Sequence, residues 1–222
     1  MPPRPYWSYE RGTLWAMDLT DDPPPMSTPA PAGVTLGEAQ PEDVAELAAA
    51  MGAPDPQGVV QRFVSGRRCF VARVEGAVAA YGWVSEGAES IGELERTMRM
   101  QPGEAYIWDC VTLPAFRRRG LYVALLRHVV GVLRAEGLRR LWIGASQDNM
   151  PSIRGFRSAG FRPVIKLVYL RVLRLRGNWL VGDATAPPAL VADARHALSG
   201  AGPERRKSVA ARASHADASD IR

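Results

Sequence analysis

The stretch WDCVTLPAFRRRGLYVALLRHVV, from Trp108 to Val130, constrains the fold more than any other part of the chain. It begins as an apolar run typical of a buried strand and continues as an amphipathic helix. The helix carries its apolar residues on one face, at Tyr122, Leu125, Leu126, Val129 and Leu133. Three arginines and a glycine, Arg117 to Gly120, separate the two elements. A strand that turns directly into a helix predicts a fold that mixes strands and helices.

The rest of the central region also alternates predicted strands and helices. Two β-rich runs joined at Glu75-Gly76 predict a hairpin. Asn149 and Pro151 predict the start of a helix that Gly160 ends. Predicted strands cover 34–36, both arms of the hairpin, 92–100, 106–113, 139–146, 162–165 and 167–175, and predicted helices cover 41–51, 57–64, 121–136 and 150–159.

The length of the chain predicts one domain with flanking extensions. Its 222 residues are enough for a substantial core, and 46% of them are hydrophobic. We expect the domain at 33–176, a Pro-rich extension at 1–32, and a largely disordered extension at 177–222 that includes a possible helix over 188–198. The aromatic residues of the N-terminal extension could dock on the domain or on a partner; they are Tyr6, Trp7, Tyr9 and Trp15.

Composition limits the expected cellular location and the classes of expected partner. No apolar run approaches the roughly 20 residues that span a bilayer. The first residues lack a signal-peptide core, so a cytoplasmic location is expected, with no membrane partner. Cys69 and Cys110 are expected to be reduced, and with three histidines no metal site is expected. The net charge of +5 fits a small polyanion; nucleic acid is less favoured because no basic and aromatic stripe is present.

The turn at Arg117 to Gly120 has the properties of an anion-binding site. The first N–H groups of the following helix lack partners within the helix, and the helix dipole favours an anion there. Gly120 lets a ligand approach the backbone, and the arginines add charge. The turn has no GK(S/T) ending and no G-x-G-x-x-G, so it is neither a Walker A loop nor a Rossmann turn. It is either a phosphate site or a surface turn that the arginines merely solvate.

Two motifs resemble the GCN5-related N-acetyltransferase (GNAT) superfamily. Its acetyl-CoA loop reads (Q/R)-x-x-G-x-(G/A) after a strand that ends in V-x-x-P. The matching residues here are Val111-Thr112-Leu113-Pro114 and Arg117-Arg118-Arg119-Gly120-Leu121-Tyr122. The family's next motif, N-x-x-(A/S)-x-x-x-Y-x-x-x-G-F, appears in order as Asn149, Ser152, Phe156, Gly160 and Phe161. The resemblance covers roughly residues 33–176.

The resemblance implies an α/β fold with a central mixed, mostly antiparallel sheet flanked by helices. Two strands are expected to splay apart and form the acyl-CoA cleft. By resemblance, Val111 and Leu113 pair their backbone with the pantetheine arm of acetyl-CoA, the cosubstrate. The backbone from Arg118 to Tyr122, including Gly120 and Leu121, would hold the pyrophosphate, and the side chains of Arg117, Arg118 and Arg119 would add to that site. Asn149, Ser152 and the position of Phe156 would lie at the pantetheine or thiol end. No metal is implied.

Two positions depart from the family's pattern. The loop ends in Tyr122 where the family has Gly or Ala, so a bulky ring either packs under the loop or narrows the pocket. Phe156 stands where the family often has a tyrosine that protonates the leaving thiolate, and a phenyl ring cannot donate a proton. Loss of a general acid typically costs about 10²–10⁴ in rate. Transfer would need another donor or a water.

The candidate general bases are carboxylates near the expected acceptor side: Glu93, Glu95, Glu104 and Asp109. Strand alternation puts Glu104, Tyr106, Trp108 and Cys110 on one face, and Ile107, Asp109 and Val111 on the other. Asp109 is the most informative, because a carboxylate in an apolar strand is either a base or a structural acceptor for backbone or an arginine. Tyr106 could relay a proton or belong to the core, and Cys110 is expected to be a small core residue.

The favoured function is a GNAT-type N-acetyltransferase that moves an acetyl group from acetyl-CoA to a primary amine of a small molecule or protein. The amine would attack the thioester directly. The alternative is a catalytically weak or inactive CoA-binding regulatory or interaction module, which Phe156 and the long extensions favour. The acceptor is unidentified: the glutamates between residues 86 and 95 suit a cationic amine, or form an ordinary solvated edge. A homodimer is a possible assembly.

Overall fold

The computed structural model describes residues 7–20, 31–53, 55–91, 96–172 and 175–201, and its described strands form one large and one small sheet. The large sheet has eight strands in the order β10-β9-β1-β8-β7-β4-β3-β2. In chain order they are β1 (Trp7–Asp18), β2 (Val34–Ala39), β3 (Arg68–Val74), β4 (Ala77–Glu86), β7 (Glu104–Thr112), β8 (Arg140–Ser146), β9 (Arg162–Val172) and β10 (Leu175–Gly182). Among these neighbours, β7 and β8 pair in parallel and the others pair antiparallel. The mixed, mostly antiparallel sheet that the family resemblance implied is confirmed.

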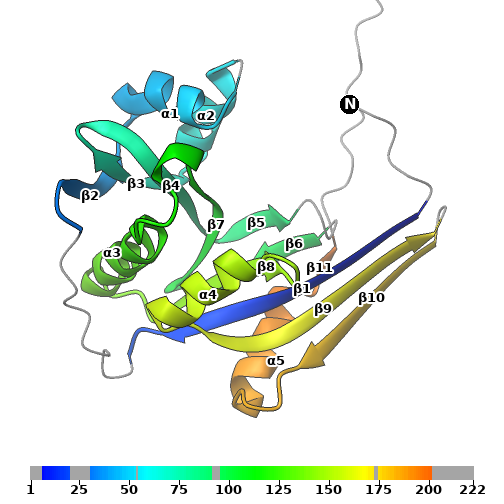
Figure 1. Cartoon of the computed structure of the whole chain (residues 1–222). Helices are drawn as coiled ribbons and strands as arrows, with labels where there is room; N and C mark the ends of the chain where they lie inside the picture. Colours follow the sequence, from blue (N-terminus) through cyan, green and yellow to red (C-terminus); the bar gives the residue numbers. More distant parts are fainter. Residues whose placement is uncertain (1–6, 21–30, 54, 92–95, 173–174, 202–222) are drawn as a thin grey trace, which may run out of the picture.

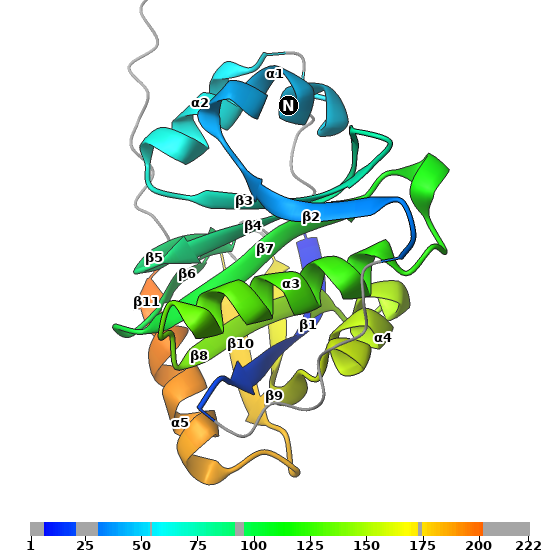
Figure 2. The same cartoon turned by 90° about the vertical axis from the view of Figure 1, so that its left-hand side faces the viewer.

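Helices cover both faces of this sheet (Figures 1 and 2). They are α1 (Val44–Ala50), α2 (Gln57–Val64), α3 (Leu121–Ala135), α4 (Met150–Ala159) and α5 (Pro188–Ala197), with the 3-10 turns η1 (Pro41–Asp43) and η3 (Pro114–Phe116). Because side chains alternate along a strand, the two faces have separate cores. One lies under α3 and α4 and includes Trp15 and Met17. The opposite face packs Leu14 and Ala16 in the cluster that includes α5, and Trp83 in the cluster that includes α1 and α2.

α3 provides the connection that the parallel pair requires. Antiparallel strands can be joined by a tight turn, but parallel strands need a crossover, usually a helix. The chain leaves β7, makes the turn η3 and returns along α3 to β8. The helix buries Leu121, Leu125, Leu126, Val129, Val130 and Leu133. The apolar face predicted from the helical spacing therefore packs on the sheet, and Tyr122, the remaining member, is partly buried against the same core.

The N-terminal segment departs most from expectation. β1 lies between β8 and β9, paired with β8 over Gly12–Asp18 and with β9 over Trp7–Ala16. The expectation that residues 1–32 form an extension outside the domain is wrong for residues 7–18. The reason is burial: Trp15 is 2% exposed, so the aromatic residues there belong in part to the core. Figure 1 shows β1 running beside β9 along their length.

The C-terminal boundary also extends beyond residue 176. β10 pairs with β9, α5 packs on the sheet, and β11 (Gly200–Ala201) pairs with β6 (Arg96–Arg99) in a small second sheet with β5 (Ala88–Ile91). The helix expected over 188–198 is present, whereas the two closing strands expected at 162–165 and 167–175 form the single strand β9. Glu93 and Glu95 lie outside the described residues. None of the helices in the described ranges is long and apolar enough to cross a membrane.

Candidate active site

β7 and β8 diverge partway along their length. They pair only from Glu104 opposite Arg140 to Ile107 opposite Ile143. Beyond that point β7 stays paired with β4 on its outer edge, and β8 stays paired with β1. Backbone groups on the two facing edges are then left for a ligand that can hydrogen bond as a strand does. This is the splayed arrangement that the family resemblance implied.

The N-terminus of α3 follows β7 after one short turn. Gly120 is its N-cap residue, with a φ of 75° and no side-chain hydrogen bond to the first N–H groups. A Cβ built on Gly120 would meet no atom within 4 Å, so open space lies beside this cap. Arg118 has a positive φ of 63°, a conformation that costs non-glycine residues energy and is frequent at ligand-binding turns. The uncapped N–H groups and the open space together suit an anion.

The three arginines of the turn are exposed, but two of them contact neighbouring groups. Arg117 donates from Nε to the Thr112 carbonyl at 3.2 Å, and the Arg119 guanidinium lies 5.5 Å from the centre of the Phe116 ring. These contacts fix the shape of the turn as well as its charge. Each arginine is free to shift its solvent-facing atoms toward a bound anion at modest cost, because exposed ionic contacts are weak.

The backbone N–H of Leu113, the residue that follows β7, does not face the cleft. Its N–H donates to the Ala79 carbonyl at 2.9 Å, so the expectation that Leu113 pairs through this group with a pantetheine arm is wrong. Val111 lies opposite Tyr81 and packs under α1 and α2. Since hydrogen-bonding directions alternate along a strand, Thr112 is the residue whose backbone faces the open edge.

Asp109 lies at a β-bulge just after the divergence. Trp83 pairs with Trp108 and Tyr81 with Val111, so Asp109 and Cys110 together oppose one residue, Gly82. The φ of Asp109 is 45°, and a Cβ at Gly82 would lie 2.9 Å from Cys110 Sγ. The extra residue reverses the alternation: Cys110 packs on the α3 side, and Val111 packs on the side of Trp108. The faces predicted for these two residues are therefore wrong.

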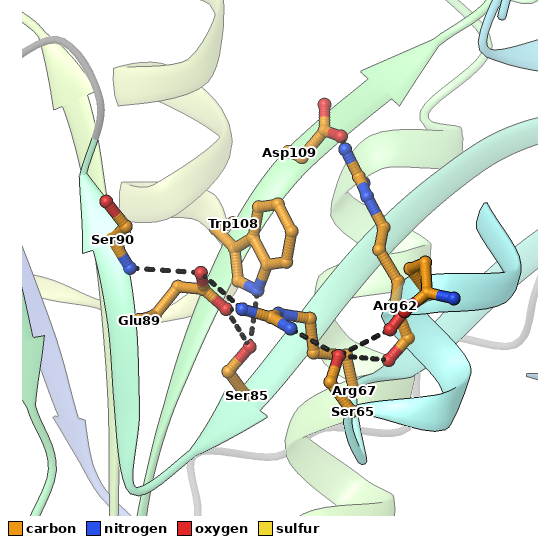
Figure 3. Close-up of polar contacts among 9 residues, drawn as sticks. Arg62, Ser65, Arg67, Ser85, Glu89, Ser90, Trp108 and Asp109 are labelled. Carbon is orange, nitrogen blue, oxygen red and sulfur yellow. Dashed lines mark hydrogen bonds and ion pairs between the residues drawn. The ribbon is translucent and has the colours of Figure 1, made fainter. Parts of the chain in front are cut away.

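Arg62 of α2 holds the Asp109 carboxylate. Its Nη1 lies 2.5 Å from Asp109 Oδ2, and its guanidinium lies 4.6 Å from the Trp108 ring centre and 4.9 Å from that of Trp83. The side chains of Arg62 and Asp109 are 25% and 30% exposed, so solutes can reach the pair. Figure 3 shows Arg62 extending from α2 toward Asp109 on β7. Asp109 was expected to be either a base or a structural hydrogen-bond acceptor, and the structure shows it accepting a hydrogen bond from Arg62.

A second ionic group adjoins Trp108 (Figure 3). The Trp108 Nε1 donates to Ser85 Oγ at 2.8 Å, and Ser85 donates to Glu89 Oε2 at 2.6 Å. Arg67 contacts the same carboxylate at 2.7 Å. Burial alone would raise the pKa of Glu89, but the hydrogen bonds from Arg67, Ser85 and the Ser90 amide outweigh it and lower the pKa. Glu89 is therefore an ionised anchor for Arg67 rather than a solvated edge residue.

Glu104 occupies the start of β7, away from the divergence, and is fully engaged. Arg139 Nη2 and Arg140 Nη1 lie 2.9 and 3.2 Å from its Oε1. Trp142 Nε1 and the Gln101 amide donate to Oε2 at 3.0 and 3.2 Å. Its side chain is 1% exposed, so it cannot reach a substrate and is a structural anchor instead of a base. Tyr106 is 7% exposed and packs in the core that includes α5, so its proton-relay role stays a prediction.

Replacing Glu104 by Gln should lower the free energy of unfolding by about 1–3 kcal/mol, because the amide nitrogen would face donors instead of accepting from them. Chemical denaturation measures this effect. The matched control is Glu86→Gln at the exposed end of β4, where a near-neutral change is expected. Acetyl-CoA affinity should not change in either variant; a loss of affinity in Glu104→Gln at unchanged stability would contradict the structural assignment.

Tyr122, Ser152 and Phe156 meet where α3 and α4 pack. The Tyr122 and Phe156 ring centres are 6.3 Å apart, and the Ser152 side chain is near enough to the Tyr122 hydroxyl to act on its pKa. Asn149 is engaged at the α4 cap, where its Oδ1 accepts from the Ser152 amide at 3.2 Å. Phe156 is 1% exposed and also packs on Trp15, with ring centres 5.9 Å apart. Phe156 is thus a core residue, and the hydroxyl beside it comes from Tyr122.

The two cysteines are free thiols in the structure. Burial raises the pKa of Cys69 to about 12 and raises the pKa of Cys110 as well. Both thiols therefore stay protonated at neutral pH, and neither has the thiolate character of a nucleophile. Among the described residues, no group of three or more His, Cys, Asp or Glu side chains could hold a metal ion.

The geometry agrees with a family profile. The profile of the Acetyltransferase (GNAT) family matches residues 38–161, which include the splayed strands, the turn before α3 and all of α4. The chain belongs to this family of acetyltransferases. No curated protein matches the chain in sequence.

Solved structures share the fold at low sequence identity. A GCN5-related N-acetyltransferase from Sphaerobacter thermophilus is 19% identical, with a TM-score of 0.54 over 78% of this chain and 53% of that one. A putative GNAT-family acetyltransferase from Novosphingobium aromaticivorans is 21% identical, with a TM-score of 0.50 over 76% and 67%. A tandem GNAT protein from the clavulanic acid biosynthesis pathway is 19% identical, with a TM-score of 0.52 over 81% and 55%. This chain thus spans between half and two thirds of these relatives.

Proposed function

We propose that this protein transfers an acetyl group from acetyl-CoA to a primary amine, in the cytoplasm, by direct attack of the amine on the thioester. The observation that carries the proposal is the divergence of β7 from β8 beside the uncapped N-terminus of α3. The open edges would receive the amide-bearing pantetheine arm, and the α3 N–H groups at Gly120 would receive the pyrophosphate. Acetyl-CoA supplies the activated acetyl group. The residues of this chain orient it and transfer protons during the reaction.

The proposed contacts follow from what each residue has available. Thr112 offers its backbone N–H to the arm, although its carbonyl already accepts from Arg117, whereas the N–H of Leu113 is committed to Ala79. The N–H groups from Arg118 to Tyr122 would hold the pyrophosphate, with Arg117, Arg118 and Arg119 adding charge. Asn149 and Ser152 would lie at the thiol end of the cosubstrate, where α4 begins.

Asp109 is the proposed general base, because it is the partly exposed carboxylate at the divergence. Among the described residues, Arg62 contacts Oδ2, and no second hydrogen bond to this carboxylate is formed. A protonated amine could replace the Arg62 guanidinium between Asp109 and the Trp108 ring, because these groups attract any such cation. The proposed acceptor is therefore a cationic amine, which would pass its proton to Asp109 before attack.

Replacing Gly120 by Ala should weaken acetyl-CoA binding by about tenfold or more, because the new methyl group enters the open space beside the helix N–H groups. Isothermal titration calorimetry measures this. Gly137→Ala is the matched control at the other end of α3, where φ is 87° and a Cβ also meets no atom within 4 Å. Both variants carry the same left-handed strain of about 1–2 kcal/mol. Equal affinities in the two variants would contradict a pyrophosphate site at Gly120.

The proposed activity is tested by release of the CoA thiol from acetyl-CoA across a panel of amines. The panel pairs cationic amines, such as polyamines and lysine peptides, with neutral amines of similar size, and mass spectrometry identifies the acetylated product. Amine-dependent thiol release with N-acetyl product supports the proposal. Tight CoA binding with no product from any amine would favour the alternative, a CoA-binding module without catalysis.

A further inference from the structure

A tyrosine hydroxyl is present beside Phe156, but it comes from a different helix. Tyr122 lies in the first turn of α3, and the Cδ1–Cε1 edge of its ring lies against Gly155 of α4. A Cβ at Gly155 would lie 2.6 Å from Tyr122 Cδ1 and Cε1, so the glycine makes room for the ring. Ser152, one turn before Phe156 on α4, lies near this hydroxyl and favours its ionised form.

Helix geometry indicates which turn of α4 a tyrosine hydroxyl at position 156 would face. Side chains of an α-helix lean toward its N-terminus and cover the turn before their own Cα. A longer ring at position 156 would therefore direct its hydroxyl toward the turn that contains Ser152. Phe156 instead ends in the core among the rings of Trp15, Tyr122 and Phe161, with centres between 5.9 and 6.4 Å away.

Resting on the proposed function, we propose that Tyr122 is the proton donor to the leaving thiolate, oriented by Ser152. As the amine nitrogen bonds to the acetyl carbon, the C–S bond breaks and its electron pair goes to sulfur. The Tyr122 hydroxyl hydrogen bonds to this sulfur and gives it a proton. The CoA thiol leaves with that proton, the nitrogen of the new amide releases its extra proton to solvent, and the tyrosinate takes one back from solvent.

The surroundings of Tyr122 suit this role. Burial raises its pKa, the nearby Cys110 acts in the same direction, and the Ser152 side chain opposes both. The hydroxyl therefore keeps its proton at neutral pH and is present as a donor when negative charge develops on sulfur. A donor already fixed in a site with little water stabilises developing charge without reorganisation. Cys110 lies on β7 and Ser152 on α4, so groups from both elements act on the hydroxyl.

The test is the pKa of the thiol of bound CoA, read from the ultraviolet absorbance of the thiolate, and it needs no acceptor. A hydrogen bond to a charged group is worth enough that Tyr122→Phe should raise this pKa by about one to two pH units. The melting temperature should stay near that of the wild type, because only the hydroxyl is removed. Tyr122→Phe combined with Phe156→Tyr should restore part of the lower pKa, and Ser152→Ala should give an intermediate value.

Each outcome decides the matter. A bound thiol with the same pKa in the wild type and Tyr122→Phe would overturn the role of Tyr122 and leave the proposed function standing. Tighter CoA binding in Tyr122→Phe at unchanged pKa would overturn it too, by showing that the ring only narrows the cleft. Failure of the wild type to bind CoA would sink the proposed function and this inference together.

Discussion

Replacing Trp15 by Ala should lower the free energy of unfolding by about 3–5 kcal/mol. Trp15 is 2% exposed and packs on Phe156. It lies in β1, which is hydrogen bonded between β8 and β9 in the sheet. Among the described residues its Nε1 has no hydrogen-bond partner, so the loss is one of packing. Since domains are stable by about 5–15 kcal/mol, this change should remove a large share of the total.

Chemical denaturation monitored by circular dichroism measures this effect. Tyr9→Ala is the matched control, because Tyr9 lies on the same strand and is 49% exposed. We expect the control to change the free energy of unfolding by less than about 1 kcal/mol. Similar small losses in both variants would mean that β1 is not part of the core.

Replacing Asp109 by Asn should lower kcat by about 10²–10⁴ with the best amine of the panel, because the amide cannot accept the proton of the amine. Steady-state kinetics measure kcat and KM separately. The control is Arg62→Gln, which breaks the same ion pair but leaves the carboxylate in place. A base at Asp109 predicts that Arg62→Gln keeps kcat near wild type. If both variants lose kcat to the same extent, Asp109 acts by holding Arg62, and the proposed base is wrong.

The two predictions concern the place of β1 in the sheet and the role of Asp109. Local sequence patterns say little about the first and more about the second. The residues LWAM, Leu14 to Met17, form a continuous apolar run, which is typical of a strand buried on both faces. The prolines that follow make the segment resemble a tail, and the pairing of β1 with β8 joins residues more than 120 positions apart. Such pairing depends on the whole sheet. Short patterns in the sequence therefore leave the place of β1 undetermined.

Elements with their own start and stop signals were predictable. α2 has the bounds expected from the sequence, 57–64, and α3 begins at Leu121 directly after Gly120. Asn149 caps α4 through the Ser152 amide, as its position before Pro151 indicates. The turn at Glu75-Gly76 has positive φ at both residues, 52° and 85°, which a two-residue hairpin favours. Caps and tight turns depend on residues that are close in sequence, so they can be predicted from the sequence alone.

The site was predictable where it depends on backbone and less so where it depends on distant side chains. The turn before α3 and the start of α4 follow from motif residues. The partner of Asp109 does not, because Arg62 lies 47 positions away. The bulge at Asp109 likewise depends on Gly82 across the sheet, and it reverses the faces of Cys110 and Val111. The sequence did indicate that Asp109 has a partner, because a carboxylate within an apolar strand needs a hydrogen-bond donor or a cation beside it.

The most direct test of the central claim, that the splayed strands and the N-terminus of α3 bind acetyl-CoA, is a calorimetric titration of the whole chain with acetyl-CoA. We expect saturable binding with one molecule per chain, and competition by free CoA. We also expect loss of affinity in Gly120→Ala and none in Gly137→Ala. Absence of binding to the folded wild-type protein would contradict the account.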